Sequence, residues 1–485
     1  MPLILPGNVA TATAATTYSV DNSCMFNGVD TYLSRTTSSA TPTLATKATL
    51  SFWIKTLSPT NQYITYTNGG TSPYFYMQFP DSNGKLVILD YIGGGSSTDI
   101  VGTFVLRDPS AWMHVVYSYD STPSTPSSSS IKIFINGVQT TALTGGSAYA
   151  AQNTATKLTA ASVAHPIGVH ANTSAQFLNA YLAEYMVVDG QALNADSFGE
   201  FDSDSPTIWK PKDISGITVG NQGYYLDFKD SSNLGNDVGG NNFDFTSNNI
   251  DATNQATDTP TNNFCVMNPL DNYFADSTFS EGNCKIVTTA SKYTFNTGTF
   301  GLTAGKWYFE VKNSVSSDGN KNLIGISAVP SDAATNYLGE DAYMWGYYGN
   351  NGNMITGASS SSYGTAYANN DIVGVFIDLD NNKLYTADNG TINNSGTGVS
   401  LTAVASTTSG VYFPALGDYA SGGTAGEFEV NFGGCPAYTI SSAVADANGY
   451  GAFEYDPSDG GSSSFDSAAK DFLAICTKNL GSDGG

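Results

Sequence analysis

Apolar and polar residues alternate with a period of two along much of the chain. In residues 48–56, Leu50, Phe52 and Ile54 would share one face of a strand, and the residues between them would share the other. The same alternation is found in residues 111–120, 131–135, 181–188, 306–311, 373–379 and 428–432. Strands with one buried face show this pattern, which therefore predicts an all-β protein of antiparallel sheets.

Turn residues follow two strand-like segments. Asn136-Gly137 after residues 131–135, and Asn389-Gly390 after residues 383–387, are pairs that favour tight hairpins between antiparallel strands. The exception to the strand pattern is residues 467–480, where apolar positions are spaced as on a helix and Asp466 is the expected N-terminal cap. We therefore expect one short helix near the C-terminal end of a β protein.

The predicted strands fall into two groups, separated by a segment of different composition. With 485 residues, the chain exceeds what one hydrophobic core usually holds. Asp, Asn, Gly and Thr crowd the segment between the groups. We predict a jelly-roll domain over residues 1–215, an irregular connector over 216–272, a second β-sandwich over 273–435, and a C-terminal tail with the short helix over 436–485.

Charged residues are scarce, and most of them are acidic. They make up 12% of the chain, and the net charge is −24. Arginine occurs only at Arg35 and Arg107, so the chain lacks the basic surface that phosphate binding needs. No apolar run approaches the ~20 residues of a membrane-spanning helix, and the first residues lack the basic segment of a secretory signal. We therefore expect neither nucleic acid nor a membrane among the partners.

The cysteines are widely spaced. They are Cys24, Cys265, Cys284, Cys435 and Cys476. No two of them form the Cys-x-x-Cys pair that is typical of zinc and redox sites. We expect buried thiols in a protein that folds in a reducing compartment, and no disulfide on which stability depends.

Candidate catalytic acids are few. Glu200 and Asp202 occupy alternate positions, as the acid and the nucleophile of a glycosidase strand would. They lie between Gly199 and Ser205-Pro206, however, which favours a solvated acidic turn. The Gly-x-Ser-x-Gly motif of serine hydrolases is absent from the sequence. We therefore predict that the protein is not an enzyme and has no catalytic residues.

Potential metal ligands do not form a recognisable site. The histidines are His114, His165 and His170. The last two are close in sequence, but no third ligand lies at the spacing of a zinc site. Asp378, Asp380 and Asn382 match the first ligand positions of a calcium loop, yet its glycine and closing glutamate are missing, which favours a hairpin. No metal or cofactor is predicted.

Aromatic, acidic and amide side chains gather in the glycine-rich segment 341–350. They are Asp341, Tyr343, Trp345, Tyr347, Tyr348 and Asn350. Aromatic rings cover the apolar faces of sugars, and carboxylates and amides bind the hydroxyl groups. We predict that these residues bind the ligand, on a loop of the second domain. Packing in the core or at a subunit interface is the alternative for each aromatic residue. Tyr74, Tyr76 and Tyr91 form a looser set in the first domain.

Each strand-rich region carries an ordered set of strand and turn residues. In the first, the set is residues 50–55, Trp112-Met113-His114-Val115, residues 133–137, Ile167-Gly168 and residues 181–193. This region resembles the laminin-G, concanavalin A-like jelly roll. The second region resembles a SPRY domain, through residues 305–311, 324–326, 371–380, 383–385, 388–390 and 411–414. The resemblance implies two antiparallel jelly-roll or sandwich domains, and SPRY domains bind proteins through their loops.

Four further segments are similar to virion structural proteins of marine bacteriophages, many of them tail fibres. These segments are residues 3–10, 181–193, 208–212 and 476–480. The resemblance implies a tail-fibre or surface adhesin of a virus particle, assembled in the host cytoplasm, that binds a host-cell glycan or receptor. By analogy with tail fibres, it also implies contacts with other virion proteins and a homo-oligomer, with a trimer favoured.

Three functions stay open on these grounds. The first is the adhesin, and the second is a purely structural protein that decorates or assembles a capsid or tail. The third is a polysaccharide depolymerase, for which the sequence shows no recognisable acid pair. Labelling of host cells by the purified protein, with a block of infection, separates the first function from the second.

Overall fold

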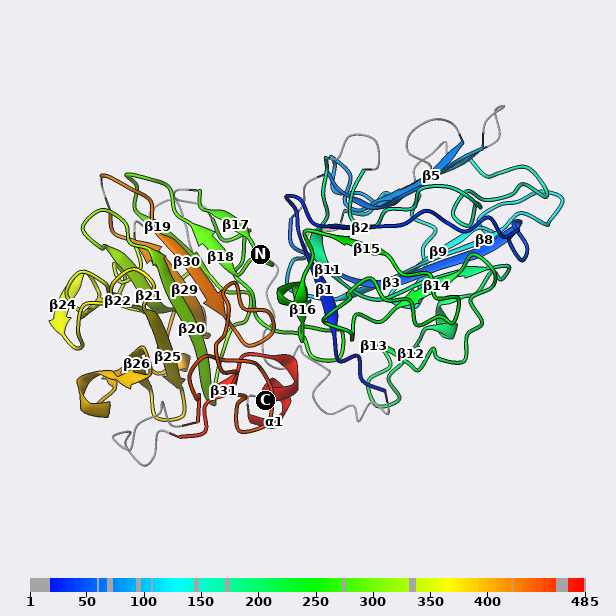
Figure 1. The fold of residues 1–485 in the computed structure, drawn as a ribbon. Coiled ribbons are helices and arrows are strands. Elements are labelled where there is room, and N and C mark those ends of the chain that lie inside the picture. Colours follow the sequence, from blue (N-terminus) through cyan, green and yellow to red (C-terminus); the bar gives the residue numbers. More distant parts are fainter. Residues whose placement is uncertain are drawn as a thin grey trace. The chain divides into compact units, whose positions relative to one another are not determined.

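The structure is a computed structural model. It describes residues 18–483 except for residues 59–60, 68–72, 93–96, 106–107, 144–147, 171–174, 273–275, 331–336, 421 and 459–469. Arg107, Asp466 and the segment 3–10 therefore lie outside the described residues. The chain divides between Thr261 and Asn262 into two compact units, shown in Figure 1. Residues 14–261 are called the first domain below, and residues 262–485 the second.

Two facing sheets build the first domain (Figure 1). The large sheet has the order β10-β9-β8-β3-β11-β1-β16, and β14 also pairs with β11. Its strands are β1 (Ser23–Asn27), β3 (Lys47–Thr56), β8 (Met113–Asp120), β9 (Lys132–Ile135), β10 (Val138–Gln139), β11 (Asn179–Asp189), β14 (Tyr224–Leu226) and β16 (Gln255–Ala256). The small sheet has the order β4-β5-β6-β7, with β4 (Tyr63–Tyr66), β5 (Tyr74–Gln78), β6 (Val87–Tyr91) and β7 (Ser97–Val101).

Shorter elements complete the first domain. Two-stranded sheets are formed by β2 (Tyr32–Ser34) with β15 (Thr246–Asn248), and by β12 (Gly199–Phe201) with β13 (Trp209–Pro211). Short 3-10 helices are η2 (Ala195–Ser197) and η3 (Ala252–Asn254). The β9–β10 turn is the predicted hairpin, and both Asn136 (φ 47°) and Gly137 (φ 79°) adopt the left-handed backbone that it requires.

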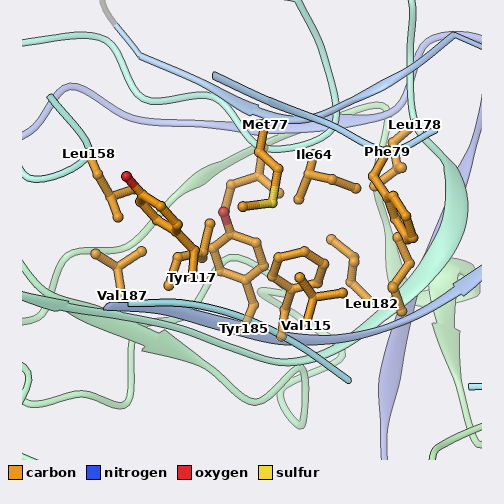
Figure 2. Close-up of a cluster of buried hydrophobic side chains, with 14 of the residues drawn as sticks. Ile64, Met77, Phe79, Val115, Tyr117, Leu158, Leu178, Leu182, Tyr185 and Val187 are labelled. Atoms are coloured by element: carbon orange, nitrogen blue, oxygen red, sulfur yellow. The ribbon is translucent and has the colours of Figure 1, made fainter. Parts of the chain in front are cut away.

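The core of the first domain lies between its two sheets. Figure 2 shows Met77 and Ile64 of the small sheet pointing toward Tyr117, Tyr185 and Leu182 of the large sheet. All of these side chains are buried. The period-two pattern predicts this arrangement, because alternate side chains of a strand point to opposite faces of a sheet.

The predicted connector over residues 216–272 belongs to the first domain up to Thr261, and its largely irregular course includes three short strands that join the sheets. Its strands β14, β15 and β16 pair with β11, β2 and β1, and the domain boundary lies after Thr261. Each of these strands is two or three residues long. The sequence predicts a strand over residues 224–228, where buried and less buried positions alternate, and β14 confirms it. β15 and β16 are too short to show such a pattern.

The second domain is also built of two sheets (Figure 1). The larger has the order β17-β18-β30-β20-β25-β26-β27, with β28 on β26 and β31 on β20; the other has the order β19-β29-β21-β22-β23-β24. The strands of the larger are β17 (Thr278–Ser280), β18 (Lys285–Val287), β20 (Lys306–Val315), β25 (Ile372–Asp378), β26 (Lys383–Asp388), β27 (Thr391–Ile392), β28 (Val399–Ser400), β30 (Glu427–Asn431) and β31 (Leu473–Ala474). Those of the other are β19 (Thr294–Thr297), β21 (Asn322–Ser327), β22 (Met344–Tyr348), β23 (Asn353–Thr356), β24 (Ser359–Ser362) and β29 (Phe413–Asp418).

Apolar side chains from both sheets fill the core of the second domain. Trp307, Phe309 and Val311 of β20 are fully buried, and so are Ile324 and Ile326 of β21. The 3-10 helices are η4 (Asn393–Gly396) and η5 (Val404–Ser406). The all-β fold with two antiparallel sandwich domains is therefore confirmed.

A short C-terminal helix exists, but at a different place from the predicted one. Helix α1 spans Thr477–Asp483, whereas residues 473–474 form β31, which pairs in parallel with β20. Phe472 and Ile475 are fully buried against the second domain. The apolar residues around 472–475 therefore pack in the core beside a short strand. Pairing with β20 stabilises that strand more than the helix that their spacing predicts. Within the described residues, no helix is long and apolar enough to cross a membrane.

A carboxyl group is buried in the core of the first domain. Asp90 on β6 is inaccessible to solvent, and its Oδ1 accepts a hydrogen bond from the backbone N–H of Lys157 at 3.0 Å. Its Oδ2 has no hydrogen-bond partner among the described residues. Burial raises the pKa of Asp90 from 3.8 to about 6.

Asp90→Asn is expected to stabilise the first domain at neutral pH. The folded-state pKa of Asp90 lies above its unfolded value. Its contribution to the stability of the folded state is therefore most favourable below about pH 4 and is lost as pH rises through about 6. An amide cannot ionise, so the variant should exceed the original protein in its free energy of unfolding at pH 7 by roughly 2–3 kcal/mol. Urea unfolding at pH 4 and pH 7 measures both values. The control is Asp99→Asn at an exposed position, and an equal pH dependence of all three proteins would contradict the prediction.

Candidate functional site

The predicted binding segment 341–350 is not a loop. Residues 344–348 form β22, between β21 and β23 in the second sheet of the second domain. Trp345 is 4% exposed and Tyr347 is fully buried. The prediction of a binding loop is wrong for this reason: the period of two along β22 places both rings in the core.

Contacts inside the second domain engage these two rings. The Trp345 ring lies 5.7 Å from the Tyr412 ring, edge to face. The Tyr347 hydroxyl donates to Asp388 Oδ2 at 2.8 Å, and the side chain of Asn393 donates to that hydroxyl at 3.1 Å. Neither ring is therefore available to a ligand.

Steric crowding, rather than a bend in the chain, explains the glycines of this segment. A Cβ atom at Gly346 would lie 2.9 Å from the carbonyl oxygen of Leu338, and one at Gly349 would lie 2.9 Å from the Tyr367 ring. A real Cβ does not approach other atoms so closely. Glycine is required where β22 passes these neighbours, and this requirement produced the loop-like composition.

The other four predicted residues do not converge on one place. Asp341 and Asn350 are exposed at opposite ends of β22, and Tyr343 is half-buried. Tyr348 is also half-buried, but it lies in a ring cluster with Tyr419, with 6.1 Å between ring centroids. Because Tyr348 follows Tyr347 directly, it points to the opposite face of the sheet.

A different group of aromatic residues lies together on the first domain. It consists of Tyr63 and Tyr66 of β4, Tyr74 and Tyr76 of β5, Tyr91 of β6, and His170, and is called the tyrosine face below. On β5, Phe75 and Met77 are fully buried, whereas the alternating Tyr74 and Tyr76 are only half-buried. The tyrosines thus lie on the side of the small sheet that faces away from the core.

Ring contacts hold the tyrosine face together. The ring of Tyr66 stacks on those of Tyr74 and Tyr76, with 5.7 Å between centroids in both pairs. Tyr91 lies 5.3 Å from Tyr74. The His170 ring meets Tyr66 at 4.5 Å. A packed row of rings is rigid, so a ligand that binds to it causes little loss of side-chain entropy.

The tyrosine face also offers hydrogen-bonding groups. The hydroxyl groups of Tyr74, Tyr76 and Tyr91 have no partner in the described part of the chain. Asp99 of β7 is exposed and lies opposite Leu89, which in turn lies opposite Tyr76.

An amide pair extends this polar surface. Gln78 occupies the next outward position of β5 after Tyr76 and is half-buried. Its Nε2 donates to Asn61 Oδ1 at 2.8 Å. Both amides retain further donors and acceptors, which sugar hydroxyl groups can use.

Burial keeps Tyr63 and His170 of the tyrosine face uncharged near neutral pH. It raises the pKa of Tyr63 to about 12, and neighbouring tyrosines add to this effect. Burial also lowers the pKa of His170 below its ordinary value, so the imidazole is neutral. Neutral rings with hydroxyl-bearing edges suit the mixed apolar and polar surface of a sugar.

Sequence patterns suggested only part of the tyrosine face. Tyr74, Tyr76 and Tyr91 were recognised as a loose set, whereas Tyr63 and Tyr66 were not. A β-bulge between Tyr63 and Thr65 brings residues three apart in sequence to the same face, so a strict period of two misses them. His170 lies close to β4 because Ile167, three residues earlier, forms a β-bridge with Thr65 of that strand. No pattern in the neighbouring sequence predicts this long-range contact.

The other candidate motifs have structural partners. Lys210 Nζ lies 3.5 Å from Glu200 Oε1 and 3.2 Å from Asp202 Oδ2, and Asp202 also accepts backbone hydrogen bonds from Asp204 and Ser205. Glu200 lies on β12, opposite Lys210 of β13, and only Asp202 lies in the turn that follows the strand. Asp202 is 3% exposed, so the solvated acidic turn expected for these residues is wrong for Asp202, and the expected loop is a strand at Glu200.

The histidines and the calcium-like motif hold no metal site. His114 packs between the rings of Trp53 and Trp209, and its Nδ1 accepts a hydrogen bond from Trp209 Nε1 at 3.0 Å. Burial lowers the pKa of His114 to about 3. Asp378 Oδ1 accepts from the backbone of Asn381 at 2.9 Å, as in a hairpin turn. Among the described residues, no group of three His, Cys, Asp or Glu side chains could hold a metal ion.

Comparisons with known proteins identify both domains. The family model described as the concanavalin A-like lectin/glucanases superfamily, Laminin_G_3, matches residues 27–197. The SPRY domain model matches residues 306–430. No curated protein sequence matches the chain.

Several solved structures are similar to part of the chain. The SPRY domain of human HERC1 is 15% identical, over 36% of this chain and 99% of that one, with a TM-score of 0.28. A second human SPRY domain is 18% identical, over 30% of this chain and 90% of that one, with a TM-score of 0.25. Stonustoxin is 18% identical, over 34% of this chain and 27% of that one, with a TM-score of 0.26.

The two family matches lie inside the two strand-rich regions that the sequence defines. Residues 27–197 belong to the first domain, whose two sheets carry the tyrosine face, and residues 306–430 belong to the second. The chain therefore combines a laminin-G-type, concanavalin A-like domain with a SPRY domain.

Proposed function

We propose that this protein is an adhesin that binds host-cell-surface glycans through the tyrosine face of its concanavalin A-like domain. The observation that carries the proposal is the row of mutually packed tyrosines on the outer side of the small sheet, in which Tyr74, Tyr76 and Tyr91 are partly exposed and rest on the buried Tyr66 and Tyr63. A protein of this fold needs the buried face of that sheet for its core. The outer face needs no partly exposed aromatic residues for folding, so Tyr74, Tyr76, Tyr91 and His170 there favour a ligand.

A glycan is the ligand that this chemistry favours. The rings offer apolar surface, and the unpartnered hydroxyls, Asp99 and the Gln78–Asn61 pair offer hydrogen bonds to sugar hydroxyl groups. The net charge of −24 disfavours nucleic acids and other polyanions. The family of the first domain includes lectins by its description, which supports the same conclusion.

We further propose that the protein is part of a virus particle, as a tail fibre or other surface protein. The similarity of residues 181–193, 208–212 and 476–480 to marine bacteriophage virion proteins supports this assignment. The proposal includes contacts with other virion proteins and a homo-oligomer, with a trimer favoured. It also holds that the protein binds its glycan without cleaving it, because Glu200 and Asp202 are engaged by Lys210.

A purely structural virion protein is the second candidate. The observation that favours it is an aromatic cluster on the second domain, formed by Tyr293, Tyr337, Tyr348 and Tyr419, all half-buried. The rings of Tyr293 and Tyr419 stack at 5.1 Å. Tyrosine is enriched where proteins meet, so this cluster is suited to a neighbouring subunit or virion protein.

A binding screen separates these candidates. The purified protein is applied to a glycan array and to capsular and outer-membrane polysaccharides of marine bacteria, and bound polysaccharides are assayed for new reducing ends. We expect selective binding to one glycan class and no release of reducing ends. Binding to no glycan and to no host cell would favour the structural role, and release of reducing ends would show a depolymerase.

A further inference from the structure

A buried glutamate interrupts the central strand of the first domain. Glu184 lies in the middle of β11, where the pairing with β3 shifts between Ala183 and Met186. Its φ of 50° is the left-handed conformation, which is strained for a residue with a side chain. A bulge with glycine there would avoid both this strain and the burial of a carboxyl group, so packing alone does not explain glutamate.

Two tyrosines bind the carboxylate of Glu184. The hydroxyl groups of Tyr18 and Tyr225 both donate to its Oε2, at 2.9 and 2.8 Å. No described residue donates to Oε1. The side chain is 4% exposed, and burial raises its pKa to about 6. Glu184 is therefore a carboxylate that is nearly inaccessible to solvent and accepts hydrogen bonds at only one of its two oxygens.

A cavity lies beside this group. Its volume is about 300 Å³, and Tyr18 and Tyr225 both line it. Apolar side chains form another part of the wall, with Met186, Ile214 and Val219 among them. Ligand pockets begin at about this size, so the cavity suits a small molecule of a few carbon atoms.

The cavity and the tyrosine face lie on opposite sides of the first domain. Along β11, Tyr185 and Val187 face the core between the two sheets, whereas Met186 and Val188 pack on the other side, against Ile214 and Val219. A ligand in the cavity is thus separated from the tyrosine face by both sheets. The two sites can be tested independently.

The charges around the cavity are mostly negative. Asp213 and Asp227 line it together with Lys229, and Glu184 lies behind the two tyrosines. The O–H groups of Tyr18 and Tyr225 both donate to Glu184. Toward any further partner, such as a ligand, each tyrosine oxygen can therefore act only as a hydrogen-bond acceptor. The cavity wall thus carries two carboxylates and two tyrosine oxygens that can accept hydrogen bonds, against one positive charge, that of Lys229.

We infer that this cavity is a binding site for a small organic ammonium ion, such as an alkylamine or the amino group of an amino sugar. An ammonium group donates hydrogen bonds to the carboxylates and tyrosine oxygens, and aromatic rings attract it further. Its hydrocarbon part lies against the apolar wall. Anions are repelled by the carboxylates, and a neutral alcohol lacks the positive charge that Asp213 and Asp227 in the wall, and Glu184 behind the two tyrosines, attract.

Matched ligands of one shape test the inference on the full-length protein. Binding of cyclohexylammonium, cyclohexanol and cyclohexanecarboxylate is measured by ligand-observed NMR and isothermal titration calorimetry. We expect the ammonium ion to bind at least about 10-fold more tightly than the alcohol, and no binding of the carboxylate. Equal binding of the ammonium ion and the alcohol, or binding of neither, would overturn the inference.

Two variants locate the bound ion. Glu184→Gln keeps the size of the side chain and should weaken ammonium binding about 10-fold or more. Val238→Trp, at a 44% exposed residue of the cavity wall, should block binding and tests the site even where Glu184→Gln fails to fold. Asn350→Ala, at an exposed position of the second domain, should leave ammonium binding unchanged. Undiminished binding in Val238→Trp would place the ion elsewhere and contradict the assignment.

Discussion

Tyr76→Ala is expected to weaken glycan binding about 30-fold or more, which corresponds to ~2 kcal/mol for an aromatic residue at the centre of a binding site. Tyr76 is central in the tyrosine face, because its ring contacts those of Tyr63, Tyr66 and Tyr74. It lies on the outer side of the small sheet, so the core between the sheets is unchanged. The dissociation constant for the best glycan of the array, measured by calorimetry, gives the result.

The matched control for this variant is Tyr348→Ala. Tyr348 is also half-buried, also lies in a ring cluster on a strand, and belongs to the second domain. We expect it to leave glycan binding unchanged and to affect contacts with protein partners. Loss of glycan binding in Tyr348→Ala, with full binding in Tyr76→Ala, would move the glycan site to the second domain.

Trp345→Ala is expected to destabilise the second domain by about 3–5 kcal/mol, the usual cost of removing a large aromatic side chain from a core. The Trp345 ring is 4% exposed and packs against Tyr412, and its strand pairs with β21 at Ile326. Calorimetry of the full chain should show a lower melting temperature for one transition.

Asn350→Ala is the control for Trp345→Ala. Asn350 was predicted to bind the same ligand, but it is exposed after the end of β22 and should change stability by less than about 1 kcal/mol. If Trp345→Ala instead keeps full stability and loses host-cell binding, the ring is exposed to ligand, as the sequence suggested. The two variants thus distinguish a core residue from a contact residue.

Local patterns in the sequence were sufficient for the fold class and for the two families. Alternation in residues such as Leu50, Phe52 and Ile54 predicts strands, because neighbouring side chains of a strand always point to opposite faces. The Asn136-Gly137 hairpin was predictable for a similar reason, since few residues accept left-handed backbone at both positions. Both features depend on a few consecutive residues.

Only the tertiary structure decided which face of each strand is buried. Tyr76 and Trp345 occur in similar aromatic strands, yet a second sheet covers the face of β22 that carries Trp345, while the face of β5 that carries Tyr76 lies outside the sandwich. The period of two defines two faces but does not say which one another sheet will cover. That choice depends on strands far away in the sequence.

The same reason explains the other differences. Residues 473–474 have helical spacing around them, but β20 offers a strand with which to pair. Tyr63 and Tyr66 share a face only because a bulge in β4 shifts the register. The strain at Glu184 and the cavity beside it arise where β11, β14 and the segment around Tyr18 meet. Contacts between distant segments determine each of these features, so no local pattern of residues could have shown them.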